Sequence, residues 1–140
     1  MIICVIDGQG GKIGSVIIER LKERLREDVE IIALGTNSIA TQTMMKARAN
    51  KGASGENAIV RTVKKANIII GTLGILMVNS MLGEFTDRMA ASVAESEAMK
   101  FILPVTQDQV VIVGLRGLSI PQMIGELIEA VAKEVRGCAR

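Results

Sequence analysis

The segment of residues 7–14 constrains the fold of this chain more than any other. It reads Asp-Gly-Gln-Gly-Gly-Lys-Ile-Gly, and the residues before it, 2–6, form a short uncharged run rich in branched side chains. Such a run is typical of a strand that is buried on both faces. After the segment, apolar residues recur at helical spacing: Ile13, Val16, Ile17, Leu21 and Leu25. The pattern predicts a strand, a tight glycine turn and an amphipathic helix, in that order.

A strand, a glycine turn and a helix form the opening of a Rossmann-type unit and predict an anion site. Glycine lets backbone N–H groups approach a ligand closely, and the first turn of a helix carries free N–H donors with a partial positive charge. We therefore expect this site to bind a nucleotide or another small phosphate-bearing ligand. A phosphate or sulfate ion would occupy the same site. The expected contact residues are Gly8, Gln9, Gly10, Gly11, Lys12, Ile13 and Gly14. The alternative is a turn that binds no ligand.

The glycine spacing does not identify the ligand. It is one residue longer than the dinucleotide fingerprint, so NAD(P) is one candidate among other nucleotides. The segment also resembles the turn of short-chain dehydrogenases, but Lys12 replaces the middle glycine. A Walker phosphate loop is excluded, because Ile6 stands where a glycine is required and Ile13 where a Ser or Thr is required.

The composition excludes several classes of chemistry. The chain has no His, so neither Ser-His-Asp nor Cys-His catalysis nor a His-ligated metal is expected. It has no Tyr, so the Tyr-Lys pair of short-chain dehydrogenases is impossible, and two distant Cys do not make a structural zinc site. A net charge of +2 and only two Phe argue against a nucleic-acid partner, and the charge also argues against a membrane surface.

The size of the chain predicts a single domain, residues 1–140. Hydrophobic residues make up 49% of it and aromatic ones 1%, so aliphatic side chains and Met must fill the core. So much apolar surface in a small chain favours a homodimer or a larger homo-oligomer, with residues 75–82 or the last helix in the interface. The longest apolar stretch, 68–78, is too short to cross a bilayer, and the cysteine usage is typical of the cytoplasm.

Further candidate site residues follow the second predicted strand, residues 29–34. Thr36, Asn37 and Ser38 would either cap the next helix or contact the ligand. A dinucleotide site usually carries an acidic residue here to bind the ribose, and its absence weighs against NAD(P).

Between the second and third predicted strands, the chain is expected to return to the edge of the sheet that carries the glycine turn. Two helices are expected, at 39–49 and 56–66, with an extended segment at 50–55 between them. This geometry places the start of the second helix, Glu56 and Asn57, at the same edge as the glycine turn. The third strand, 67–71, brings three more candidates there: Gly71, Thr72 and Gly74.

The C-terminal part predicts a change of strand direction. A helix is expected at 75–82, and another begins after Thr86. The strands 101–105 and 110–114 are joined by residues 106–109, a connection too short for a parallel crossover. We therefore expect a three-layer, Rossmann-like α/β sandwich with a mostly parallel sheet and an antiparallel C-terminal hairpin strand. A capping box at Ser119 begins the last helix.

Four motifs resemble a bacterial family that is catalogued as a domain of unknown function, DUF3842. They are residues 7–11 with 13–14, residues 33–37, Gly55-Glu56-Asn57-Ala58-Ile59, and Asn79-Ser80-Met81-Leu82-Gly83-Glu84. The resemblance runs over nearly the whole chain. It implies a small cytoplasmic protein and supplies no established activity.

The middle of the chain is also similar to methylglyoxal-synthase-like domains. That similarity implies phosphate binding by Thr36, Asn37 and Ser38, with Glu56 as the catalytic acid, although those enzymes also use histidines.

Three functions remain open for this chain. They are a non-catalytic nucleotide or phosphate-ligand binding protein, a phosphate-eliminating or isomerising enzyme with Glu56 or Asp7 as base, and a structural partner in an oligomer.

Overall fold

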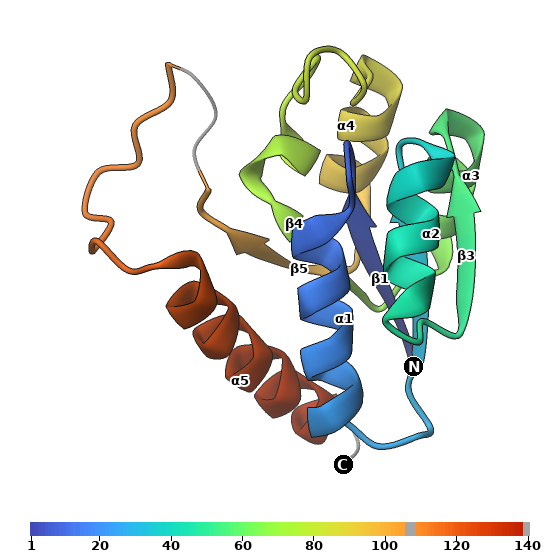
Figure 1. The fold of residues 1–140 in the computed structure, drawn as a ribbon, viewed down its shortest axis with the longest axis vertical. Helices are drawn as coiled ribbons and strands as arrows, with labels where there is room; N and C mark the ends of the chain where they lie inside the picture. The colour runs from blue at the N-terminus through green and yellow to red at the C-terminus, as the bar shows by residue number, and fades with distance from the viewer. Residues whose placement is uncertain (106–108, 139–140) are drawn as a thin grey trace.

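The computed structural model describes residues 1–105 and 109–138, and these form an α/β fold around one five-stranded sheet. The strands are β1 (Ile2–Asp7), β2 (Glu30–Gly35), β3 (Lys51–Ser54), β4 (Ile68–Thr72) and β5 (Met99–Leu103). They lie in the order β3-β2-β1-β4-β5, and every adjacent pair is parallel (Figure 1). The predicted α/β class is confirmed, and the strand order is that of a Rossmann-like fold.

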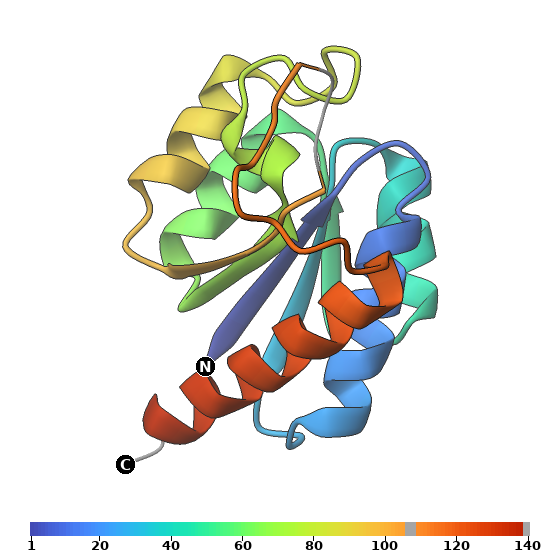
Figure 2. The ribbon, with the colours of Figure 1, turned by 90° about the vertical axis from the view of Figure 1, so that its left-hand side faces the viewer.

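Helices cover both faces of this sheet (Figure 2). One face carries α1 (Lys12–Arg24), α2 (Ser38–Lys46) and α5 (Ile120–Cys138), and the other carries α3 (Glu56–Thr62) and α4 (Asp87–Glu95).

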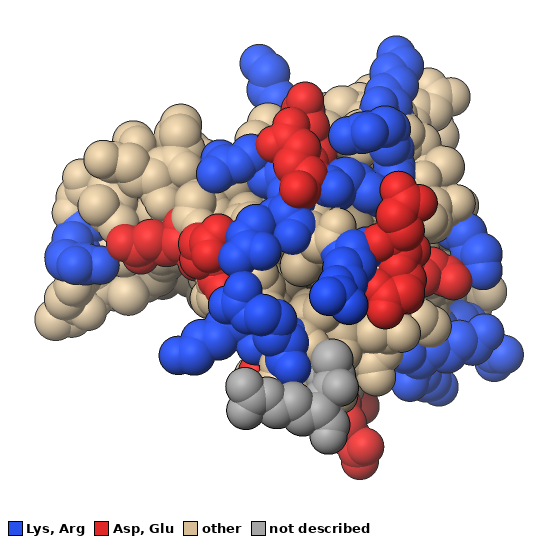
Figure 3. Space-filling model, turned by 90° about the horizontal axis from the view of Figure 1, so that it is seen from below, with Lys and Arg blue, Asp and Glu red and all other residues tan. Residues whose placement is uncertain are grey.

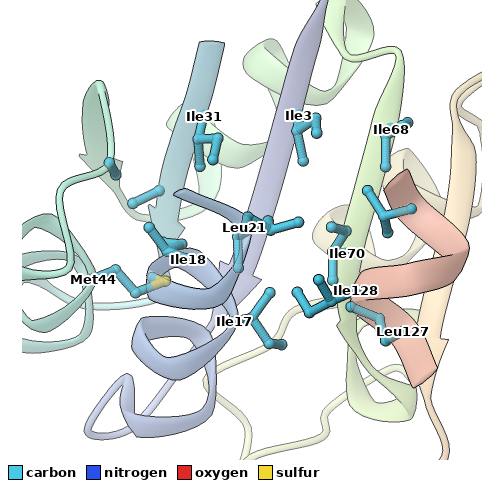
Figure 4. Close-up of a cluster of buried hydrophobic side chains, with 14 of the residues drawn as sticks. Ile3, Ile17, Ile18, Leu21, Ile31, Met44, Ile68, Ile70, Leu127 and Ile128 are labelled. Atoms are coloured by element: carbon cyan, nitrogen blue, oxygen red, sulfur yellow. The ribbon is translucent and has the colours of Figure 1, made fainter. Parts of the chain in front are cut away.

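Two hydrophobic cores follow from this layering. Ile3 and Val5 of β1 point into the first core, and Cys4 and Ile6 point into the second. In the first core, drawn in Figure 4, apolar side chains of α1 and α5 pack side by side against the sheet. A central parallel strand is buried on both faces, which is why its sequence shows no polar alternation.

The crossover between β2 and β4 has the predicted path. After α2, residues Lys51–Ser54 form the edge strand β3, which pairs in parallel with β2. The chain thereby returns to the carboxyl edge, where α3 begins at Glu56. A short 3-10 turn, Val63–Lys65, then leads to β4.

The predicted antiparallel hairpin is wrong. Residues 110–113 form no strand, β5 is the edge strand and parallel to β4, and most of the expected turn, 106–108, lies outside the described residues. β5 ends at Leu103 because Pro104 has no N–H to donate to a ladder. The β propensity of Val and Ile reflects packing on a half-buried sheet surface, and residues 109–118 instead leave the body of the molecule (Figures 1 and 2).

The predicted helix over 75–82 is also wrong. A 3-10 turn, Leu73–Leu76, follows β4, and the chain then forms a series of turns up to the start of α4. We call residues 77–86 the covering loop. Asn79, Met81 and Leu82 have φ values of 62°, 58° and 56°, which end any helical path. Met81 and Phe85 of the loop are buried without helical spacing, whereas Val78 and Leu82 are 57% and 99% exposed.

The last helix begins as predicted. The Ser119 N–H donates to Gln122 Oε1 at 2.9 Å, and the Gln122 N–H donates to Ser119 Oγ at 3.3 Å.

Among the described residues, no helix combines the length and the apolar character that a bilayer crossing needs. On the face seen from below in Figure 3, Lys and Arg side chains lie beside Asp and Glu side chains.

Candidate functional site

The loops after β1, β2 and β4 meet at the carboxyl edge of the sheet, where the strand order reverses. From β1 the chain proceeds to β2 on one side, and β4 lies on the other side. The Thr36 N–H donates to the Asp7 carbonyl at 3.0 Å and joins the first two loops. In open parallel sheets, ligands bind in the crevice at this reversal point.

Three glycines of the glycine turn are required by close packing. Gly11 has a φ of 71°, and a Cβ there would lie 2.5 Å from a backbone oxygen of α2. A Cβ on Gly14 would lie 2.6 Å from a methionine sulfur of α2, and one on Gly8 would collide with Met81 of the covering loop. These glycines let α1, α2 and the covering loop approach one another.

Gly10 is different, because a Cβ there would meet no atom of the described residues within 4 Å, and its backbone is not left-handed. It faces open space beside the start of α1. Among the residues that the structure describes, the N–H groups of Gly10, Lys12 and Ile13 have no hydrogen-bond acceptor. Gln9, with a φ of 50°, turns the chain just before these donors.

Asp7 caps the start of α1 from the end of β1. Its carboxylate accepts hydrogen bonds from the N–H groups of Gly8 and Gly14, each at 2.8 Å. Burial raises the pKa of Asp7 and the charge of Glu84 adds to the effect, while the two N–H donors oppose it. Both oxygens of this candidate base are therefore engaged by backbone.

Asn37 ties three segments together. Its Oδ1 accepts the Ala40 N–H at 2.8 Å and caps α2, as one of the two interpretations of the sequence predicted. Its Nδ2 donates to the Gln9 carbonyl at 3.0 Å and to Glu84 Oε1 at 2.6 Å. Its neighbour Ser38 is the exposed first residue of α2.

Glu84 of the covering loop is the residue that our sequence reasoning missed. Its Oε1 accepts the hydroxyl of Thr36 at 2.5 Å, besides the amide of Asn37. The Thr36 hydrogen bond lowers the pKa of Glu84, and the Asn37 amide and the Gln9 N–H act in the same direction against partial burial. The available signal was its place at the end of the fourth motif, directly after a glycine.

Glu56 lies at the predicted edge but contacts α4 rather than the glycine turn. Its Oε1 accepts the hydroxyl of Thr86 at 2.6 Å, and its Oε2 pairs with Arg88 Nη1 at 3.3 Å. α3 and α1 cover opposite faces of the sheet, which separates the two helix starts. Asn57 is exposed beside Glu56.

The candidates after β4 lie beneath the covering loop. A Cβ on Gly71 would lie 2.8 Å from Ile75 Cδ1, and the carbonyl of Gly74 accepts the buried Ser80 hydroxyl at 2.6 Å. Thr72, the last residue of β4, is buried. These residues support the loop that covers the crevice.

The fold and the site define a Rossmann-like α/β domain whose glycine turn lies at the reversal point of a parallel sheet. The chain belongs to the family described as Domain of unknown function (DUF3842), whose sequence model matches residues 2–136. No curated protein matches the chain. The similarity to methylglyoxal-synthase-like domains gains no support from these comparisons.

Proposed function

We propose that the protein binds a small phosphate-bearing molecule, a nucleotide in the first instance, at the carboxyl edge between the glycine turn and the covering loop. The observation that carries the proposal is the group of N–H donors of Gly10, Lys12 and Ile13 at the start of α1, which have no acceptor within the described ranges 1–105 and 109–138. A helix start of this kind favours an anion through its partial charge as well as its donors. The exposed Lys12 adds a positive charge close by.

The surroundings of Gly10 support the same proposal. Its neighbours in the turn are glycines because helices pack against them, whereas Gly10 borders open space. A glycine without a packing or conformational requirement fits a position where a ligand approaches the backbone.

The experiment compares Gly10→Val with Gly137→Val, an exposed glycine near the end of α5 where a Cβ would also meet no described atom within 4 Å. Binding of inorganic phosphate, AMP, ATP and NAD⁺ is measured by calorimetry, and the melting temperature is measured on the same samples. We expect the Gly10 variant to melt within a few degrees of the wild type and to lose binding at least tenfold, because the valine fills the anion position. The Gly137 variant should bind like the wild type. Unchanged affinity in a folded Gly10→Val protein would contradict the proposal.

We further propose that the chain forms a homodimer through residues 109–118. Val111 and Val113 in this segment are 85% and 93% exposed. An apolar groove of about 350 Å³ lies nearby between β5 and α5, lined by Phe101 and Leu127 among others. Exposed apolar segments of this kind are typical of interfaces.

We also propose that the protein is cytoplasmic, because Cys4 and Cys138 are free thiols.

A further inference from the structure

The covering loop is held in a costly backbone conformation directly above the glycine turn. Three of its non-glycine residues have left-handed φ values, and Gly83 follows with a φ of 90°. The loop is held together by hydrogen bonds such as Asn79 N–H to the Phe85 carbonyl at 2.9 Å. Left-handed residues persist only where the surrounding structure enforces them, and they cluster at switch regions and ligand clamps.

The carboxylate of Glu84 is the polar group that this loop delivers to the site. It accepts hydrogen bonds from Thr36 and Asn37, which follow β2, and the N–H of Gln9 in the glycine turn helps to lower its pKa. All of these donors are neutral, and they converge on one anion from two separate loops. Such an arrangement of hydroxyl, amide and backbone N–H donors suits a phosphate oxygen equally well.

We propose that Gln9, Thr36 and Asn37 form an anion subsite, that Glu84 is its internal occupant, and that the phosphate group of the ligand replaces Glu84 when the covering loop moves away. This inference rests on the proposed function, and it adds that the Glu84 carboxylate competes with the phosphate of the ligand for the same donors. Two anions cannot share these donors, because each would lose its hydrogen bonds and repel the other.

Competition by Glu84 sets a measurable limit on affinity. If the loop is closed most of the time, the apparent affinity falls by the fraction of open protein. Removing the charge of Glu84 must then strengthen phosphate binding. A carboxylate that only repelled a phosphate bound at α1 would also weaken binding, but phosphate would then leave the hydrogen exchange of the covering loop unchanged.

The experiment uses two variants and one matched control. Glu84→Gln keeps an oxygen that accepts from Thr36 and Asn37 but removes the charge, while Glu84→Ala removes both. Glu97→Gln makes the same charge change at an exposed position just before β5 begins, at the opposite edge of the sheet. Titrations with inorganic phosphate and with AMP are followed by calorimetry, and amide hydrogen exchange is measured over residues 77–86.

We expect Glu84→Gln to bind phosphate at least fivefold more tightly than the wild type, and Glu97→Gln to bind like the wild type. Phosphate should also increase hydrogen exchange in the covering loop of the wild type. If Glu84→Ala does not fold, Glu84→Gln still decides the question.

Three results would overturn the inference. Equal affinity of the wild type and Glu84→Gln means that the carboxylate does not compete, while the proposed binding function stands. Weaker binding by Glu84→Gln means that Glu84 contacts the ligand directly. No binding of phosphate or AMP to any of the variants removes both the competition and the proposed function.

Discussion

At the scale of single residues, the surroundings of two carboxylates at one edge of the sheet shift their pKa values in opposite directions. Asp7 is buried at the end of β1, and burial raises its pKa. Glu84 is only partly buried and accepts hydrogen bonds, which lower its pKa. The charged form is therefore stabilised at Glu84 and disfavoured at Asp7.

The lowered pKa of Glu84 predicts a pH dependence of stability. Its contribution is fully present above the usual pKa of a glutamate and is lost as the pH falls through the lowered pKa of the folded state. The free energy of unfolding of the wild type should therefore exceed that of Glu84→Gln most at neutral pH, and the difference should shrink below about pH 4. Urea unfolding at a series of pH values checks this. A difference independent of pH would show that the charge of Glu84 does not stabilise the fold.

At the scale of elements, the close approach of α1 to α2 depends on glycine. Gly11 precedes α1 with a left-handed backbone and lies against the α2 backbone near Ala40. The approach brings the start of α1 next to Asn37, the cap of α2, so that both loops contribute to one site.

Substitution of Gly11 tests this packing. Gly11→Ala should lower the free energy of unfolding by at least about 2 kcal/mol, because it combines a disfavoured φ with a clash against backbone. Gly10→Ala should change it by less than about 1 kcal/mol, since neither effect operates there. Chemical denaturation of both variants gives the comparison. Equal stability of the two would mean that the helices separate easily at this point.

At the scale of the whole molecule, residues 109–118 stand apart from an otherwise layered domain (Figure 1). The described part of the chain pairs β5 only with β4, so the outer edge of the sheet is open. An open edge and an exposed apolar segment in one chain are features that a second copy would cover.

The proposed homodimer predicts a mass of twice 15.0 kDa in light scattering at micromolar concentration. Replacing Val111 and Val113 together by Ser should shift the protein to the monomer, because these are the most exposed large hydrophobic side chains among the described residues of the segment. Val78→Ser, at a 57% exposed valine of the covering loop, is the matched control and should leave the dimer intact. A wild-type monomer over the whole range would rule out the dimer.

Local sequence was sufficient for much of the fold. The strand at 2–6, the glycine turn and the caps at Thr86 and Ser119 each depend on residues close together in the chain, so spacing and side-chain type predict them. Even the path through β3 followed from the need to return to the carboxyl edge before β4.

Tertiary structure alone decided the rest. Residues 110–113 have the composition of a strand but do not form one, and the covering loop buries Met81 and Phe85 without forming a helix. Glu84 meets Thr36 across 48 residues of sequence. Such a contact depends on how β1, β2 and β4 are ordered in the sheet, which no local pattern encodes. The sequence by itself therefore determined where the glycine turn and helix start lie, and the packed fold determined which carboxylate is held above them.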